Sequence, residues 1–349
     1  KITNVVLSHA HIDHSGRIPV LTKNGFSGRI VCNRATADAC EYLLLDSAHI
    51  QESDAAYLNY KAIRSHLSGS KASGSGKKKD RKDNKDIKLL KKNRHQIDVE
   101  TIAGLFKKYQ LDPVAPLYTT PDAEQALTSF DGIPFRHPVS IGENITCTQY
   151  NAGHILGSAI SIIKVEEKGR TFTICYSGDF GRFDKPILKD PTLTFAEEDR
   201  EIDLMLVEST YGDREHEQAE DTRRRLVETV TTTIERGGTV LIPAFAFGRA
   251  QELIYRLHEL YDDRIVPRVP IYIDSPLATN LTKVFGEHPE IYDRETHRQF
   301  LENGKNPFSF KQLKFVKSVE ESMALMRDDK PSIIIASSGM CEGGRILHH

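Results

Sequence analysis

Apolar residues are spaced differently in the two halves of this 349-residue chain. In the first half, residues 2–7 have the pattern of a strand, and apolar residues at helical spacing predict a helix over 35–63. A strand at 144–150 and a hairpin over 158–179 follow. A strand at 202–210 that ends in polar residues completes this half, which we interpret as a β-rich layered domain.

The second half alternates continuous apolar strands with helices. A helix over about 221–236 ends at a Gly-Gly pair, which is a helix stop signal. Strands are then predicted at 238–245, 269–276 and 331–339, and each is followed by a helical pattern. Because such strands are typical of a parallel sheet covered on both faces, this half predicts an open α/β domain.

The segment from Ser68 to Gln96 differs from both halves, because it is rich first in serine and glycine and then in lysine. It has too few apolar residues to order itself, so we predict a flexible surface insertion at about 64–100. Electrostatic contact with RNA phosphates is an alternative, but a solvated loop is the favoured interpretation.

Composition limits the class of protein. The chain is 39% hydrophobic and 28% charged, which is ordinary for a globular protein, and its length favours two domains. A net charge of −2 argues against a nucleic-acid binder that is basic throughout, although a local basic groove is compatible with it. The number of cysteines is odd, with wide spacings, which favours a reducing compartment such as the cytoplasm.

Two further predictions concern the membrane and the chain start. No apolar run approaches the roughly 18 residues that a membrane span requires, so no membrane association is expected. The chain begins with Lys1 and enters a strand at once, from which we expect that the natural N-terminus lies further upstream.

The segment "HAHIDH" contains four potential metal ligands, His9, His11, Asp13 and His14. If the strand continued through it, the first three would share one face, and a turn would bring His14 to the same rim. One short loop could then serve two neighbouring ions. Imidazole and carboxylate without thiolate suit zinc, with manganese or iron as alternatives.

Two later segments fit the same interpretation. His154 and Asp179 each follow a predicted strand, and each lies between glycines that allow close approach of the backbone. A single histidine is more often a surface or core residue than a ligand. Five or more ligand-type residues at strand ends, together with the dense cluster, favour a metal site over a structural role.

These motifs resemble a known family. "HAHIDH" matches the HxHxDH signature of the metallo-β-lactamase superfamily, and "AGHILGS" (152–158) and "YSGDFGR" (176–182) resemble its later histidine and aspartate motifs. "VESTYG" (207–212) resembles the motif that opens the β-CASP subgroup, the nucleic-acid-processing branch that includes mRNA 3′-end cleavage endonucleases and ribonuclease J. "IPAFAFGRAQEL", "DSP" and "ASSGMCEGGRILHH" resemble the domain inserted in that subgroup. The resemblance covers nearly all of the chain except about 64–100.

The resemblance implies an α/β fold. Residues 1–210 would form a metallo-β-lactamase αββα sandwich that is incomplete at both ends in this chain. Residues 211–349 would form the inserted open parallel α/β domain of the β-CASP subgroup.

The resemblance also implies a site with two Zn²⁺ ions. His9, His11 and His154 would hold the first ion, Asp13 and His14 the second, and Asp179 would bridge both. Asp13, Asp179 and Glu208 would be the catalytic carboxylates, with Glu208 orienting a histidine of the family pattern.

This chain departs from the family pattern in one respect. In the family, two further histidines follow the inserted domain, one as a general acid and one as the last ligand of the second metal. No such motif occurs before His349, and His348 and His349 belong to the "GRILHH" segment. We therefore expect the second zinc site to be incomplete in this chain.

Candidate phosphate contacts lie in the second half. Gly248 and Arg249 begin a predicted helix, where free N–H groups favour anions, and Ser337, Ser338 and Arg345 lie at or after a strand end. In open α/β sheets, ligands bind at the carboxyl ends of the strands. The alternative is that these residues are helix caps and surface arginines.

We interpret the chain as a zinc-dependent ribonuclease. It would hydrolyse phosphodiester bonds of single-stranded RNA, as an endonuclease, a 5′-3′ exonuclease or both, through a hydroxide activated by two zinc ions. DNA remains an alternative substrate, and a homodimer remains open. A hydrolase of thioesters or lactones is disfavoured by "VESTYG" and the α/β half, and a non-catalytic subunit by the complete set of testable ligands.

Overall fold

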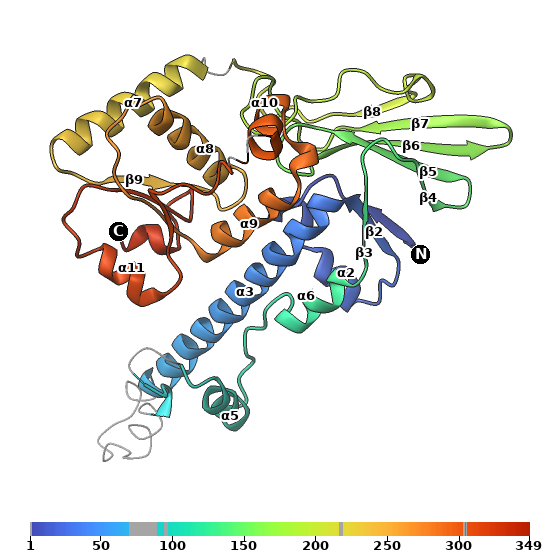
Figure 1. Ribbon diagram of the computed structural model, residues 1–349. Coiled ribbons are helices and arrows are strands. Elements are labelled where there is room, and N and C mark those ends of the chain that lie inside the picture. Colours follow the sequence, from blue (N-terminus) through green and yellow to red (C-terminus); the bar gives the residue numbers. More distant parts are fainter. Residues whose placement is uncertain (1, 70–88, 94–96, 216–218, 303, 305) are drawn as a thin grey trace, which may run out of the picture. The chain divides into compact units, whose positions relative to one another are not determined.

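The chain forms two compact units in a computed structural model, which describes residues 2–69, 89–93, 97–215, 219–302, 304 and 306–349 (Figure 1). The first unit comprises Lys1–Ser15, Ser27–Leu43 and Ser129–His349, and the second comprises Gly16–Phe26 and Leu44–Thr128. The boundary predicted between residues 210 and 211 lies inside the first unit and stays a prediction. None of the helices in the described ranges is both long and apolar enough to cross a bilayer.

The first unit contains a small parallel sheet of order β1-β2-β3. Its strands are β1 (Asn4–Val6), β2 (Arg29–Asn33) and β3 (Phe130–Ile133). The centre of β2 is fully buried, as its run of β-branched and small apolar residues requires. The first ligand segment follows β1, and a single helical turn, α1 (Ile12–Ser15), lies within it.

A second sheet of the same unit has the order β4-β5-β6-β7-β8. Its strands are β4 (Val139–Gly142), β5 (Ile145–Asn151), β6 (Ala159–Glu167), β7 (Arg170–Tyr176) and β8 (Leu204–Leu206). The hairpin predicted over 158–179 is confirmed, and its turn residues Lys168 and Gly169 both have positive φ, as tight hairpin turns require. Strand β8 is shorter than predicted and pairs with β7 in parallel.

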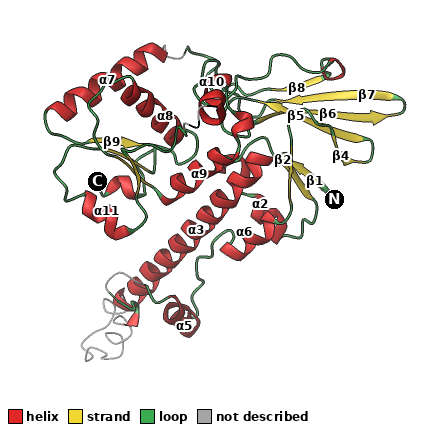
Figure 2. Cartoon of the chain, viewed as in Figure 1, coloured by secondary structure: helices red, strands yellow, loops and turns green. Residues whose placement is uncertain are grey.

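The remaining sheet of the first unit is fully parallel, with the order β11-β10-β12-β9, as the alternating pattern predicted. Its strands are β9 (Val240–Pro243), β10 (Ile271–Asp274), β11 (Leu313–Phe315) and β12 (Ile333–Ala336), of which β11 was not predicted. Strand β12 is buried throughout, because the sheet has helices on both of its faces (Figure 2).

The helices around this sheet follow the predicted alternation. They are α7 (Ala219–Glu235), α8 (Arg249–Asp262), α9 (Pro276–Glu287), α10 (Arg294–His297) and α11 (Val319–Leu325). Short turns η1 (Glu197–Asp199), η2 (Pro289–Ile291), η3 (Arg298–Glu302) and η4 (Arg345–Leu347) complete the unit. The helix expected after Gly343 is therefore only the single turn η4.

The second unit is helical, with α2 (Ile18–Lys23), the greater part of α3 (Arg34–Gly69), α5 (Val99–Tyr109) and α6 (Thr120–Leu127). The helix predicted over 35–63 is confirmed and continues to Gly69. Leu67 and Leu90 pack in one buried cluster with α5, so both flanks of the lysine-rich segment are packed. The insertion predicted there otherwise falls on residues 70–88 and 94–96, which lie outside the described residues.

A buried carboxylate at the end of β10 connects three parts of the parallel sheet. Asp274 is fully buried and accepts hydrogen bonds from the Ser322 hydroxyl, from Nη1 of Arg345 and from Nε2 of His349. Burial alone would raise the pKa of Asp274, but these hydrogen bonds and the charge of Arg345 outweigh it and lower that pKa. The carboxylate therefore fixes η4 to the carboxyl end of the sheet.

Asp274→Asn is expected to lower the free energy of unfolding by about 3–5 kcal/mol at neutral pH, because one member of a buried ion pair is removed. Because the folded-state pKa of Asp274 is lowered, this difference should be present above pH 4 and shrink as the pH falls below it. Urea unfolding as a function of pH measures it. Asp221→Asn, which breaks an exposed pair with Arg224, should cost no more than about 1 kcal/mol, and an equal cost for both variants would contradict this account.

Candidate metal centre

The first ligand segment is a loop that closes with one helical turn. The amide of Leu7 continues the pairing with Val31, and the amides of His14 and Ser15 then donate to the carbonyl of His11. The strand does not continue through His11 and Asp13, so alternation along a strand is the wrong explanation for their grouping. His11 and His14 are instead brought close in the backbone by the turn that the hydrogen bond from the His14 amide to the His11 carbonyl closes.

Gly153 and Gly157, which both have positive φ, allow the His154 loop to form. Gly157 has φ +79°, and a Cβ there would lie 2.6 Å from the backbone nitrogen of Thr36. The Thr36 hydroxyl donates to the carbonyl of Gly157 at 2.8 Å. The Ser158 hydroxyl oxygen accepts the amides of His154 and Ile155, which fixes the backbone of the predicted ligand.

The Asp179 loop meets the other two loops directly. A Cβ at Gly178 would lie 2.6 Å from Cβ of Ser8, and a Cβ at Gly181 would lie 1.9 Å from the carbonyl oxygen of Gly153. The amide of Gly181 donates to the carbonyl of Ala152 at 2.8 Å. The glycines that flank Asp179 are therefore required by the contact between loops.

These loops bring six predicted ligands together around Asp179. One nitrogen each of His9, His11 and His154 and one oxygen of Asp179 lie within 4.8 Å of one another. Oδ2 of Asp179 is 3.8 Å from Nε2 of His9 and 3.7 Å from Nε2 of His154, whereas Oδ1 is 3.4 Å from Nε2 of His14. Asp13 is largely exposed and its Oδ2 lies 3.5 Å from the same His14 nitrogen.

The geometry thus has two groups of ligands that share Asp179. His9 and His154 lie nearest Oδ2 of Asp179, His14 lies nearest Oδ1, and Asp13 lies beside His14. The assignment of each residue to an ion, which the family resemblance implied, stays a prediction.

The histidines of the first group are neutral at physiological pH. Burial, followed by repulsion from the neighbouring imidazoles, lowers the pKa of His9 to about 2. Burial is also the main reason that the pKa values of His11 and His154 are lowered to about 4. Neutral imidazoles keep a lone pair available, as metal binding requires.

One buried atom of this group has no partner. Nδ1 of His9 lies 3.1 Å from the Ser8 hydroxyl oxygen, but its Nε2 is buried and has no hydrogen-bond partner among the described residues. A buried polar atom without a partner costs about 1–3 kcal/mol. A cation held by His9, His11, His154 and Asp179 would satisfy this nitrogen, so these residues fit a metal ion.

Glu208 supports the Asp179 loop. Its carboxylate accepts the amides of Phe180 and Thr210, and its own amide donates to the Ser177 hydroxyl. Burial would raise the pKa of Glu208, but hydrogen bonds from Thr210 and Phe180 and the nearby His154 outweigh it and lower that pKa. The structure therefore places Glu208 beside Asp179, and its predicted action on a further histidine stays untested.

The predicted phosphate contacts lie at the carboxyl ends of the parallel strands. The Ser337 hydroxyl donates to Oγ of Ser275, and a Cβ at Gly339 would lie 2.9 Å from the amide nitrogen of Phe245, so the loops after β9, β10 and β12 meet. Arg249 pairs with Glu252 at 2.9 Å, and Arg345 pairs with Asp274. Ser338 lies in the same turn, where its hydroxyl accepts the amide of Met340. All four residues stay candidates for phosphate binding.

Two residues near the metal ligands were not predicted from the sequence. The ring of Phe247 packs edge-on against the ring of His11, with centroids 6.1 Å apart. Nζ of Lys185 donates to the carbonyl of His154 at 2.6 Å. Both contacts join residues that are far apart in the chain, and no local motif signals them.

The comparisons with known proteins agree with this fold and site. Residues 250–349 match the family model of the Beta-Casp domain. The whole chain also aligns with proteins named as ribonucleases and transcription termination factors, so the chain is similar to them well beyond the matched domain.

Its relatives include ribonucleases and a termination factor. The chain is 32% identical to Ribonuclease TTHA0252 of Thermus thermophilus over its full length, which covers 64% of that protein. It is 28% identical over its full length to Transcription termination factor FttA of Methanosarcina mazei and 26% identical over 97% of its length to Endoribonuclease YSH1 of Eremothecium gossypii. It spans 45% and 36% of those two proteins.

Zinc is expected to stabilise the protein through the unpartnered nitrogen of His9. At a free zinc concentration 100 times the dissociation constant, the gain is about 2.7 kcal/mol, measured as a rise in melting temperature over the chelated protein. His9→Leu should lose most of this rise. His137→Leu, which replaces an exposed histidine of the same unit, should keep it. An undiminished rise in the His9 variant would show that His9 does not hold the metal.

Proposed function

We propose that this protein is a metal-dependent ribonuclease that hydrolyses phosphodiester bonds of single-stranded RNA. The observation that carries the proposal is the position of Asp179, whose two carboxylate oxygens face two separate groups of ligands. The match of residues 250–349 to the Beta-Casp domain supports RNA as the substrate, as do the relatives named as a ribonuclease and an endoribonuclease.

The metal in this proposal is zinc. The donor set consists of imidazoles and carboxylates without thiolate, which suits zinc, with His9, His11, His154 and Asp179 at one position and Asp13, His14 and Asp179 at the other. When bound, two adjacent zinc ions lower the pKa of water and stabilise the charge that develops on the phosphate oxygens.

The chain's own residues would hold this centre in a fixed geometry. Asp179 would keep the two ligand groups at a constant separation, and Glu208 would hold its loop through the amide of Phe180. Ser158 would fix the backbone of His154. Because the supporting hydrogen bonds come from backbone amides, little reorganisation would be needed when substrate binds.

Substrate phosphates would bind at the loops after the parallel strands. A buried contact of Phe247 with His11 joins these loops to the ligand loop, so an RNA strand held by Arg249 could reach the metal centre. All five cysteines are unpaired, which agrees with a cytoplasmic location as part of this proposal. A homodimer stays an open prediction.

A substrate panel tests the reaction class. Labelled single-stranded RNA, single-stranded DNA and a simple thioester are assayed side by side with zinc-loaded protein, and RNA is expected to be hydrolysed fastest. Turnover of the thioester alone would replace the nuclease proposal with a small-molecule hydrolase, and equal rates on both nucleic acids would remove the preference for RNA.

Asp179→Ala is expected to abolish RNA hydrolysis, because the carboxylate that faces both ligand groups is lost, while most RNA binding remains. Cleavage of labelled RNA and filter binding measure the two properties. Asp184→Ala removes an exposed aspartate five residues later and should change neither. Full activity of the Asp179 variant would show that this residue does not join the two metals.

A further inference from the structure

We propose that Phe247 and Lys185 are positioning residues for the metal ligands, and that they make metal affinity depend on the start of α8. Phe247 acts on His11 and Lys185 acts on His154. The inference rests on the metal centre of the proposed function and assigns a role to two residues that do not bind the metal themselves.

The contact of Phe247 with His11 is specific in geometry. The two rings are 6.1 Å apart at an angle of 83°, which is the edge-to-face arrangement that aromatic pairs prefer. Phe247 is buried, so its ring cannot turn into solvent. Beyond it lie Phe285 and Phe308, with successive centroid distances of 6.0 and 5.7 Å. The imidazole of His11 is therefore the end of a packed row of rings.

The turn that carries Phe247 is fixed by one buried amide. Gln251 is fully buried; its Oε1 accepts the amide of Gly248 at 2.8 Å, and its Nε2 donates to the carbonyl of Ala246 at 3.1 Å. The same Nε2 lies 2.9 Å from the hydroxyl oxygen of Thr282 in α9. The backbone on both sides of Phe247 is thus held by hydrogen bonds from a single side chain, which fixes the position of its ring.

Gly248 brings the start of α8 against the second ligand loop. It has φ +88°, and a Cβ there would lie 3.1 Å from Cγ2 of Ile155, the residue after His154. A larger residue at position 248 would be strained and would also push this loop away. The segment at the start of α8 therefore contacts two ligand loops, that of His11 through Phe247 and that of His154 through Gly248.

Lys185 fixes the backbone of His154 from a further direction. Its ammonium donates to the His154 carbonyl at 2.6 Å. Burial lowers the pKa of Lys185, opposed by the carboxylate of Glu252 in α8. The amide of His154 donates to the Ser158 hydroxyl oxygen, and its carbonyl accepts from Lys185. Both backbone polar groups of this ligand residue are therefore held by hydrogen bonds.

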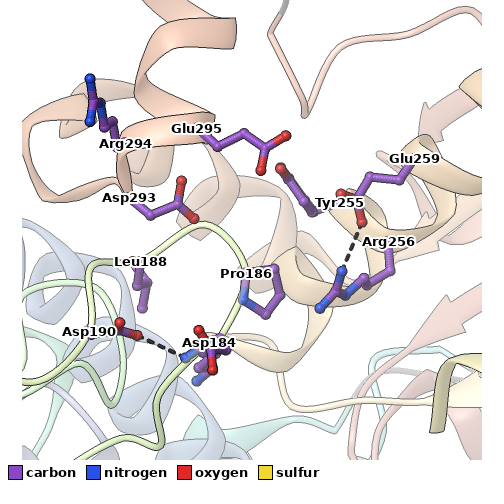
Figure 3. A pocket seen from close by; sticks show the side chains of 11 residues that line it. Asp184, Pro186, Leu188, Asp190, Tyr255, Arg256, Glu259, Asp293, Arg294 and Glu295 are labelled. Carbon is purple, nitrogen blue, oxygen red and sulfur yellow. Dashed lines mark hydrogen bonds and ion pairs between the residues drawn. The ribbon is translucent and has the colours of Figure 1, made fainter. Parts of the chain in front are cut away.

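The loop of Lys185 is itself held by the α/β half. The amide of Lys189 donates to the carbonyl of Ile291, and the amide of Asp293 donates to the carbonyl of Ile187. Figure 3 shows this loop, with Pro186 and Leu188, facing Tyr255 and Arg256 of α8 across a cavity of about 330 Å³. The Phe247 contact is therefore anchored in the segment that follows β9, and the Lys185 contact in the segment that follows α9.

These contacts have a direct chemical consequence. A histidine ligand binds a metal well only when its ring is already oriented, and residues that orient ligands typically contribute 10–100-fold to metal affinity. Without Phe247 the ring of His11 can rotate, and without the ammonium of Lys185 the His154 segment can move. Each loss should weaken metal binding while the ligand atoms themselves remain.

The test measures zinc affinity by competition with a chelator and records the visible spectrum of the cobalt-substituted protein. Phe247→Leu and Lys185→Met are each expected to weaken zinc binding about 10-fold and to alter the cobalt spectrum, because ligand geometry changes. Circular dichroism and melting of the metal-free variants establish that they fold.

The controls separate positioning from general loosening of the core. Phe285→Leu removes the next ring of the row without touching His11, and Phe245→Leu removes an exposed ring two residues away. Lys23→Met removes another ammonium bound to a backbone carbonyl, that of Leu117 in the helical unit. All three should keep the zinc affinity and cobalt spectrum of the original protein.

Two results would overturn the inference. One is an unchanged zinc affinity in folded Phe247→Leu and Lys185→Met; the other is an equal loss in Phe285→Leu and Lys23→Met. Failure of the metal centre itself is distinguishable, because the original protein would then bind no zinc in the same competition assay.

Discussion

The structure of the metal centre depends on one constraint, which is that three loops must approach closely enough for a single carboxylate to face histidines from two of them. The Asp179 loop meets Ser8 on one side and Gly153 on the other at distances that admit no side chain at Gly178 or Gly181. Backbone hydrogen bonds then close the contact. The cost is one buried polar atom, Nε2 of His9, that has no hydrogen-bond partner among the described residues.

The α/β half contributes to the same constraint, because a loop fixed only by its own hydrogen bonds would leave the imidazoles free to rotate. The ring of Phe247, which packs on His11, lies on the loop after β9. The loop of Lys185, whose ammonium donates to the His154 carbonyl, is held by hydrogen bonds with Ile291 and Asp293. Gln251 is a polar residue that is buried at the start of α8. Its burial is explained by its hydrogen bonds, which hold this turn and connect it to α9.

Much of this could be predicted from the sequence, because the signals were local. Continuous apolar strands between helices predicted the parallel sheet, and the Lys168–Gly169 turn predicted the hairpin. The dense ligand segment and the glycines around Asp179 predicted the grouping of the site. The path of the first segment was wrong, because periodicity cannot distinguish a strand end from a single helical turn. Phe247 and Lys185 were not predicted, because their contacts depend on tertiary packing between distant residues. The spacing of residues along the sequence carries no information about such contacts.

The two groups of ligands that Asp179 joins are physically unequal. His9 is fully buried, and with His11 and His154 it forms a group of three imidazoles whose lone pairs are free at neutral pH. The other group has one imidazole, that of His14, and an exposed carboxylate, that of Asp13, among the described residues. Folding has already removed water from the first group of ligands. An ion that binds there would therefore lower the free energy by pairing with the unpartnered Nε2 of His9. An ion at the second position would instead displace water from an exposed side chain, and its binding would depend more strongly on the carboxylate of Asp179.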